Sequence, residues 1–227
     1  MILVHELRPF LQDRNDAGRR LAKELSAYRG ENTLVLGAAR GGVPVALEIA
    51  IKLNAQLDII VPRKIAIPSD PEAEYGAVTE DGSIALNEPM VQQLELSDEE
   101  IVEHIENVRR EIRRRVRLYR GSRPLPSLEQ RTVILVDDGL ASGYTMLAAV
   151  KSARQGHAGK VVVAAPVASA SSQELLKPVV DDLVCLVVAD TPWFAVASFY
   201  YEWHDLSDEE VLTYLREWWE RREVGAG

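Results

Sequence analysis

The sequence predicts an α/β protein in which helices flank a parallel sheet. Short apolar runs, each suited to one buried strand, alternate with segments whose apolar residues recur at helical spacing. The alternation begins with a run, a helical segment and a second run, at residues 33–36, 43–53 and 57–61. It resumes at residues 133–136, 145–155, 161–165, 172–179 and 183–189. Strand, helix, strand in that order is a βαβ unit, whose right-handed crossover makes the two strands parallel.

A further helix is expected ahead of the first strand, over residues 13–30. Leu21, Leu25 and Tyr28 recur on one face of it, and Gly30 suits its end. We therefore expect an amphipathic helix before the first βαβ unit.

The alternation breaks in the middle of the chain. Residues 62–80 contain three prolines and several acidic side chains, so we expect an extended or mobile loop there. Ser97–Glu100 is a capping box that predicts a helix, and Ser207–Glu210 is a second one that predicts the last helix. Seven arginines lie between Arg109 and Arg120. A solvated cationic face is the simplest interpretation of such a run.

Length and composition set limits on the class of protein. The 227 residues suffice for one domain, which we take to span residues 1–227. No apolar run approaches the roughly 20 residues that cross a bilayer. The net charge of −9 argues against nucleic acid or anionic membranes as general partners. The start has no signal-peptide pattern and the single cysteine, Cys185, suits a buried position, so we expect a cytoplasmic location.

The segment Val133–Thr145 carries the most chemical information. Four apolar residues predict a buried strand, and Asp137 and Asp138 follow at its carboxyl end, where open α/β sheets bind ligands. Adjacent carboxylates are costly to bury alone, and ribose hydroxyls or a cation would satisfy them. The small residues from Gly139 onward can wrap an anion at the start of a helix, whose N–H groups attract phosphate.

Three other motifs do not match. The loop after the acid pair contains no lysine, which excludes a Walker-type ATPase motif. Residues 37–42 lack the glycine spacing of a dinucleotide-binding loop. Leu140 stands where the hydrolase nucleophile motif around Ser142 would need a glycine.

Val133–Thr145 resembles the phosphoribosyl diphosphate signature of the type I phosphoribosyltransferases. Ala39–Gly42 is similar to that family's pyrophosphate loop, and Pro62–Lys64 looks like the start of the mobile loop of a poorly characterised subgroup. The resemblance covers most of the chain. It implies the family's parallel sheet flanked by helices, with a mobile lid loop at about residues 62–90 and a small hood and helix at about residues 190–222.

The family's reaction transfers ribose 5-phosphate from phosphoribosyl diphosphate to a nitrogenous base and releases pyrophosphate, with Mg²⁺ as cofactor. The resemblance implies that Asp137 and Asp138 hold the ribose hydroxyls, directly or as Mg²⁺ ligands. It assigns the phosphate loop to Gly139, Leu140, Ala141, Ser142, Gly143, Tyr144 and Thr145. It assigns the pyrophosphate side to Ala39, Arg40, Gly41, Gly42 and Arg63, with a cis peptide between Ala39 and Arg40. Trp193 and Phe194 of the hood would stack on the base, and Lys64, Glu72 and Glu74 are candidates to handle its proton.

Three places depart from the family pattern, and the first, Ala38-Ala39 before the arginine, matters little if only backbone contacts are made there. Ala141 stands where members that act on 6-oxopurines have an aspartate, which argues against hypoxanthine or guanine. Orotate-, uracil- or adenine-like bases, or a substrate outside nucleobase salvage, stay open. Tyr144 is bulky for a phosphate loop, so its ring must point away from the ligand or cover it.

The resemblance also implies a role in nucleotide metabolism and a homodimer, with Arg63 or Lys64 near the subunit boundary. One alternative is a regulatory protein that binds phosphoribosyl diphosphate or a nucleotide without catalysis. Its usual nucleic-acid partner would need a basic face, which only Arg109–Arg120 could supply. A structural protein with an inactive fold is disfavoured because the acid pair and both phosphate loops are intact.

Overall fold

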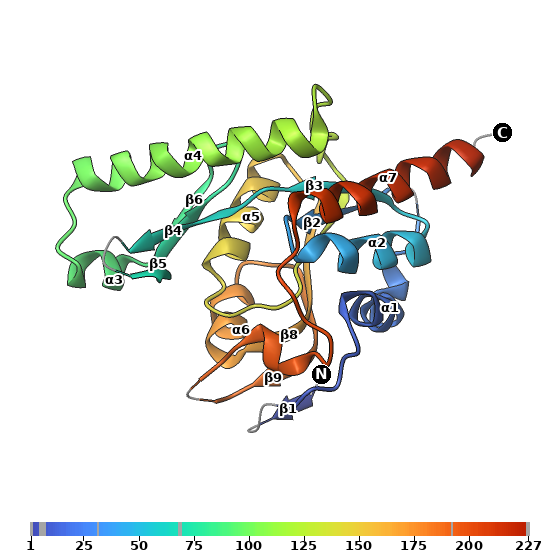
Figure 1. The fold of residues 1–227 in the computed structure, drawn as a ribbon, viewed down its shortest axis with the longest axis horizontal. Coiled ribbons are helices and arrows are strands. Elements are labelled where there is room, and N and C mark those ends of the chain that lie inside the picture. The colour runs from blue at the N-terminus through green and yellow to red at the C-terminus, as the bar shows by residue number, and fades with distance from the viewer. Residues whose placement is uncertain (1, 5–7, 31, 68–69, 192, 226–227) are drawn as a thin grey trace.

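The computed structural model describes residues 2–4, 8–30, 32–67, 70–191 and 193–225 (Figure 1). The strands are β1 (Ile2–Val4), β2 (Thr33–Ala38), β3 (Gln56–Ile60), β4 (Arg63–Ile67), β5 (Asp70–Val78), β6 (Ile84–Leu86), β7 (Thr132–Val136), β8 (Lys160–Ser169) and β9 (Asp182–Ala189). The α-helices are α1 (Arg14–Glu24), α2 (Gly42–Leu53), α3 (Glu88–Gln93), α4 (Asp98–Arg120), α5 (Tyr144–Gln155), α6 (Ala170–Leu176) and α7 (Asp208–Gly225). Short 3₁₀ turns lie at Ser26–Tyr28 and Val196–Phe199.

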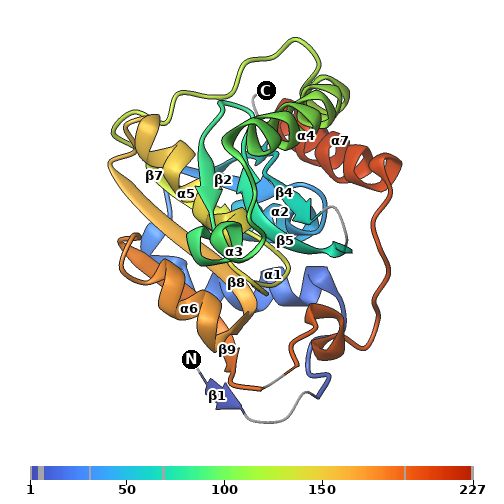
Figure 2. The same ribbon diagram turned by 90° about the vertical axis from the view of Figure 1, so that its left-hand side faces the viewer.

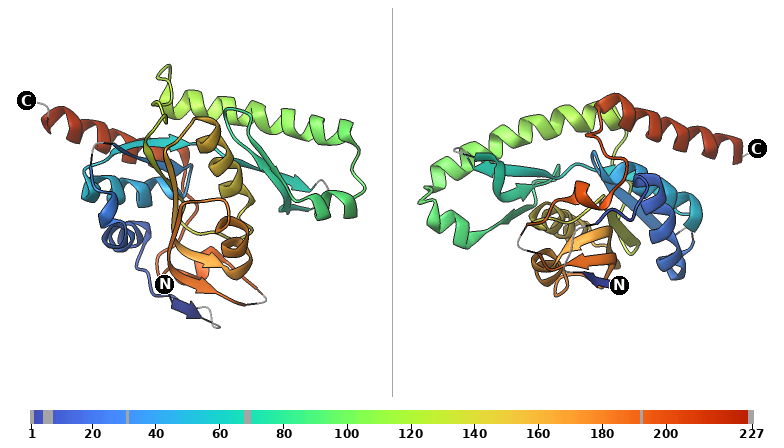
Figure 3. Two further views of the ribbon diagram at one scale, coloured as in Figure 1. Left: turned by 180° about the vertical axis from the view of Figure 1, so that it is seen from behind. Right: turned by 60° about the horizontal axis from the view of Figure 1, so that its bottom comes forward.

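The larger sheet is parallel throughout, in the strand order β1-β9-β8-β7-β2-β3. Because side chains alternate along a strand, β7 serves two apolar clusters. Ile134 and Val136 pack with α1 and α2, whereas Val133 and Leu135 pack with α5 and α6. Figure 3 shows the two pairs of helices on opposite faces of the sheet. The prediction of a parallel sheet flanked by helices is confirmed.

The expectation of a loop over residues 62–80 is wrong for most of that segment. β4, β5 and β6 form a separate antiparallel sheet in the order β4-β5-β6. Pro62 marks only the point before β4 begins, while buried Ile65 and Tyr75 join an apolar cluster with α4. The lid expected as a loop over residues 62–90 is therefore mostly a folded sheet followed by α3.

α4 is the longest helix among the described residues, with 23 residues along the small sheet (Figures 1 and 2). Its predicted capping box is present, because Ser97 accepts the backbone N–H of Glu100 and donates its own N–H to the Glu100 carboxylate at 2.9 Å. α7 begins with the second predicted capping box, at Ser207 and Glu210. No helix in the described part of the chain is long and apolar enough to cross a membrane.

Candidate functional site

Two loops meet where β2 and β7 end. The strands are neighbours in register, with Gly37 opposite Val136, so the residues that follow both strands lie at one edge of the sheet. Gly41 lies directly against the side chain of Asp138, and a methyl group there would collide with Asp138 Oδ2. The peptide bond between Ala39 and Arg40 is cis, which confirms the prediction for this loop.

Asp138 is held by a buried arginine. Arg14 Nε donates to Asp138 Oδ2 at 2.8 Å, and its Nη1 donates to the carbonyl oxygen of His204 at 2.9 Å. The guanidinium carbon lies 3.8 Å from the centre of the Trp203 ring, a cation–π geometry. Tyr200 donates its hydroxyl to the Asp138 carbonyl at 2.7 Å. Asp138 is thus neutralised inside the protein by Arg14, a residue that sequence analysis did not single out.

Asp137 has a different environment. Its backbone N–H donates to Ala164 in β8 at 3.2 Å, and its Oδ1 accepts the backbone N–H of Asp138 at 2.9 Å. Burial, and then the adjacent charge of Asp138, raises the pKa of Asp137 well above its ordinary value. No described residue forms an ion pair with its carboxylate. Asp137 is therefore the member of the acid pair that has no cationic partner among the described residues.

A cavity of about 260 Å³ opens beside Asp137. Its walls come from the predicted phosphate loop and from two residues of the small sheet, Lys64 and Glu74. The loop residues that line it are Gly139, Leu140, Ala141, Ser142, Gly143 and Thr145. The fold therefore brings together the acid pair, the phosphate loop and two of the three lid residues that sequence analysis selected. The side chain of the third, Glu72, lies outside the described residues.

Glu74 lines this cavity and connects the small sheet to the phosphate loop. It accepts a short hydrogen bond from the Ser142 hydroxyl. Burial raises the pKa of Glu74, and the bond from Ser142 and the charge of Lys64 only partly offset that effect. A carboxyl with a raised pKa in a cavity is suited to give or take a proton.

Hydrogen bonds to β8 and to the start of α6 hold the phosphate loop in place. Leu140 donates its backbone N–H to Val167 at 2.9 Å, and Ser169 Oγ donates to the Ala141 carbonyl at 2.6 Å. Gly143 has a φ of 85°, which favours glycine, and the next residue opens α5. The ring of Tyr144 packs with the alanines of the small sheet and α5, so it points away from the cavity. This loop therefore presents backbone N–H groups at a helix start, as an anion site requires.

Three arginines gather on the side of the pyrophosphate loop. The pKa of Arg63 is lowered by burial first and then by the positive charges of Arg115 and Arg40. Arg115, on the inner face of α4, is only 7% exposed, and its Nε donates to Glu111 at 2.7 Å. Its Nη1 is buried without a hydrogen-bond partner among the described residues. Such a cluster would be stabilised by a multiply charged anion. The buried position of Arg115 was not predicted, because the whole arginine run was expected to be solvated.

The aromatic residues predicted to stack on the base do not lie at the cavity. Trp193 is 84% exposed, and Phe194 packs on Phe199 with ring centres 5.5 Å apart. Neither lines the cavity, and Tyr200 serves to hold Asp138 instead. Within the described structure, these aromatics do not form a stacking pocket with the phosphate loop.

The carboxylates at the site could bind Mg²⁺ only if a substrate supplied most of the other ligands of the ion. The described residues include no cluster of three or more histidine, cysteine or acidic side chains arranged to hold a metal ion. Asp137 offers an unpaired carboxylate beside the cavity, whereas Asp138 is occupied by Arg14. Mg²⁺ commonly binds one or two carboxylates and completes its shell with water and phosphate oxygens, so these residues fit that ion.

The fold and this site define an α/β protein with a glycine-bearing loop that opens a helix and an acid pair at the carboxyl edge of its sheet. A model of the phosphoribosyl transferase domain matches residues 11–203. The chain belongs to that family, which confirms the expected resemblance.

Relatives support this assignment. Rv0571c and MT0597, from two strains of Mycobacterium tuberculosis (H37Rv and CDC 1551 / Oshkosh), are named provisionally as phosphoribosyl transferases. Each is 40% identical over 207 residues, which cover 89% of this chain but 46% of the relative. The chain thus spans about half the length of these proteins. The crystal structure of TT1426 from Thermus thermophilus is similar with a TM-score of 0.76 and 36% identity, over 92% of this chain and 98% of that one.

Proposed function

We propose that this chain is a Mg²⁺-dependent phosphoribosyltransferase that transfers ribose 5-phosphate from phosphoribosyl diphosphate to a nitrogenous base and releases pyrophosphate. One observation carries the proposal. The Asp137 carboxylate, which has no ion-pair partner among the described residues, lines the cavity beside the anion loop, and Arg40, Arg63 and Arg115 act on one another beside the neighbouring loop. A sugar with hydroxyls in the middle and phosphates at both ends complements that arrangement.

Each part of the site has a separate task in this proposal. The loop from Gly139 to Thr145 binds the 5′-phosphate through its N–H groups. Asp137 and Asp138 hold the ribose hydroxyls and position the sugar. Mg²⁺, when bound, would neutralise charge on the diphosphate as it leaves.

Arg40, Arg63 and Arg115 would stabilise the negative charge that develops on the leaving diphosphate. Preorganised cations at such a position lower the barrier most when water is excluded. Lys64 and Glu74 project from the small sheet into the cavity, so they can shield the reacting carbon from water. Glu74, with its raised pKa, is the candidate to exchange a proton with the base.

The decisive experiment measures pyrophosphate release from phosphoribosyl diphosphate in the presence of Mg²⁺ and a panel of nitrogenous bases. Release that depends on one base supports the transferase. Tight binding of phosphoribosyl diphosphate without turnover of any base would instead support a regulatory binding protein.

Calorimetry tests the site itself. We expect Asp137→Asn combined with Asp138→Asn to weaken binding of phosphoribosyl diphosphate at least about tenfold, since two charged contacts are lost. Asp190→Asn, a change of an exposed aspartate, is the control. Unchanged affinity in the double variant would remove the acid pair from the site.

A further inference from the structure

The outer face of α4 carries a pattern of charge that the proposed function does not use. Six charged side chains follow one another at intervals of four and three residues, a spacing that keeps them on one side of a helix. We call them the α4 stripe: Glu99, Glu103, Glu106, Arg110, Arg113 and Arg117. The first half of the stripe is acidic and the second half is basic.

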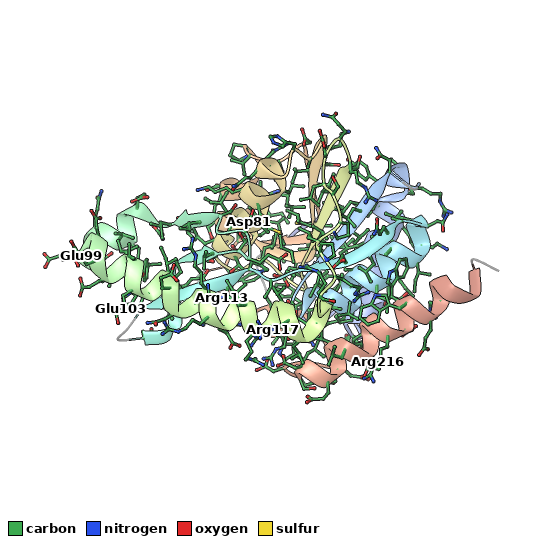
Figure 4. All side chains as sticks on the ribbon, turned by 90° about the horizontal axis from the view of Figure 1, so that it is seen from above. Asp81, Glu99, Glu103, Arg113, Arg117 and Arg216 are labelled. Carbon is green, nitrogen blue, oxygen red and sulfur yellow. The ribbon has the colours of Figure 1, made fainter. Side chains whose placement is uncertain are left out.

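The stripe faces away from the body of the protein. The apolar residues Ile105 and Ile112 turn the opposite side of α4 toward the small sheet. Figure 4 looks down on α4 and labels four stripe residues in order along it, two acidic and then two basic. These four are exposed and have no hydrogen bond or ion pair from their side chains within the described structure. Glu106 and Arg110 bond only to neighbours on α4 itself.

The order of charges in the stripe is unfavourable within one molecule. Residues three and four apart on a helix are neighbours, so the stripe places acid beside acid and arginine beside arginine. A helix that is merely solvated gains more from alternating signs. The helix dipole favours this order of charge only in the first and last turns, whereas Glu103 and Arg113 lie deeper in α4.

The pattern is antisymmetric about Val108. Each acidic residue lies as far before Val108 as one arginine lies after it. The pairs are Glu106 with Arg110, Glu103 with Arg113, and Glu99 with Arg117, at two, five and nine residues from that point. Consider a two-fold axis perpendicular to α4 at the level of Val108, on the side of the helix that carries the stripe. This axis would bring every acidic residue of the stripe opposite an arginine of an antiparallel copy.

We propose that the α4 stripe is the surface on which a second copy of this chain docks, with the two α4 helices antiparallel. Three kinds of ion pair then form, each of them twice, as a two-fold interface requires. Val102, which is 60% exposed beside the acidic half, would be partly covered by the partner helix. Nucleic acid fits less well, because half of the stripe is acidic and the chain carries a net charge of −9.

This surface differs from the subunit boundary at Arg63 or Lys64 that the family resemblance implies. Arg63 lies in the arginine cluster and Lys64 lines the cavity, whereas the stripe is on the outer side of α4. An interface of exposed ion pairs is weak and is screened by salt. We therefore expect an association through α4 that forms at low ionic strength and is lost as salt is added, in addition to any contact at the Arg63 or Lys64 boundary. The inference does not depend on the proposed enzymatic activity.

Charge reversal provides the test, with sedimentation velocity on the whole chain as the measurement. Glu99→Arg with Glu103→Arg makes one variant, and Arg113→Glu with Arg117→Glu makes the other. Each variant alone would place like charges opposite one another, so its salt-sensitive association should weaken about tenfold or more. Mixed in equal amounts, the two variants should form a heterodimer, because every reversed residue then faces one of opposite charge.

Controls with the same change in net charge lie elsewhere on the surface. Glu24→Arg with Glu129→Arg matches the first variant, and Lys52→Glu with Lys177→Glu matches the second. Both controls should dimerise as the natural chain does. Three results would each overturn the proposal: a natural chain whose association state at about 100 µM is the same in low and high salt, reversed variants that associate in low salt as the natural chain does, or a mixture that does not regain this salt-sensitive association.

Discussion

Arg14 and Asp138 are 124 residues apart in the chain and form a buried ion pair, with 2.8 Å between Nε and Oδ2. Arg14 is the first residue of α1, and Asp138 follows β7. Their contact therefore fastens the first helix to the loop that carries the acid pair. It also leaves the two acidic residues unequal, because only Asp138 has a cation within the protein.

We expect Arg14→Met to lower the free energy of unfolding by about 3–5 kcal/mol, because the variant leaves the Asp138 carboxylate buried without its partner. Urea unfolding of the protein without ligand measures this. In Arg14→Met combined with Asp138→Asn, the loss should be smaller than the sum of the two single losses. Additive losses would show that the two side chains do not depend on each other.

The raised pKa of Asp137 predicts a pH effect on the stability of the ligand-free protein. Its protonated form stabilises the fold fully below the pKa of the unfolded chain, and this contribution is lost as pH rises through the higher folded pKa. Asp137→Asn stays neutral, so its Tm should match the natural protein near about pH 4 and exceed it increasingly toward about pH 8. Thermal unfolding over that range is the measurement. A Tm difference that does not change with pH would mean that Asp137 has an ordinary pKa.

Gly41→Ala should disturb the acid pair directly, since the new methyl group would collide with Asp138 Oδ2. Overpacking of this kind costs about 1–3 kcal/mol, and here it should also weaken ligand binding because the carboxylate must move. Combining Gly41→Ala with Asp138→Ala makes room for the methyl group. Thermal unfolding should then show almost no further cost of the Gly41 change in that background, and a full cost would contradict the contact.

Glu74→Gln keeps the shape of the side chain but cannot exchange a proton. If Glu74 handles the proton of the base, kcat should fall by a factor of about 10²–10⁴. Ser142→Ala is the matched control, because it removes the hydrogen bond to Glu74 and leaves the carboxyl group in place. Steady-state kinetics with a base that is turned over would decide. Equal losses of kcat in both variants would indicate that the contact matters and the proton does not.

We expect hypoxanthine, xanthine and guanine to be poor substrates. Ala141 lies in the phosphate loop at the edge of the cavity, and a methyl group can neither donate nor accept a proton. The measurement is kcat/KM for guanine, adenine, orotate and uracil at one Mg²⁺ concentration. A preference for guanine or hypoxanthine would show that another residue replaces the missing acid.

The parallel sheet was predictable because its strands β2, β3, β7, β8 and β9 are short apolar runs, and the segments between β2 and β3 and between β7, β8 and β9 have helical periodicity. The acid pair could be placed for the same reason, since a strand's carboxyl end is visible in sequence. Helix ends were less certain: the helix expected to residue 30 becomes α1 and a 3₁₀ turn. The run in β8 also continues to Ser169, beyond the expected end at residue 165.

Contacts between distant segments could not be predicted. Nothing near Arg14 in the sequence marks it as the partner of Asp138, because that choice depends on where α1 packs. Arg115 and Arg120 belong to a run of seven arginines, and only the packing of α4 shows that these two side chains are buried. The small sheet was missed because its strands are short and the prolines around it suggested a break.

The packing of this small sheet limits how the cavity can be opened. Its alanines at 77 and 85 pack on α5, whereas Ile65 and Tyr75 pack with α4. A flap hinged at one end would have to separate from both helices and expose apolar side chains to water. The sheet is therefore held as one unit, and the side chains that it contributes to the cavity are Lys64 and Glu74. Access to the cavity would then depend on rotation of these two side chains and not on the slow swing of a loop.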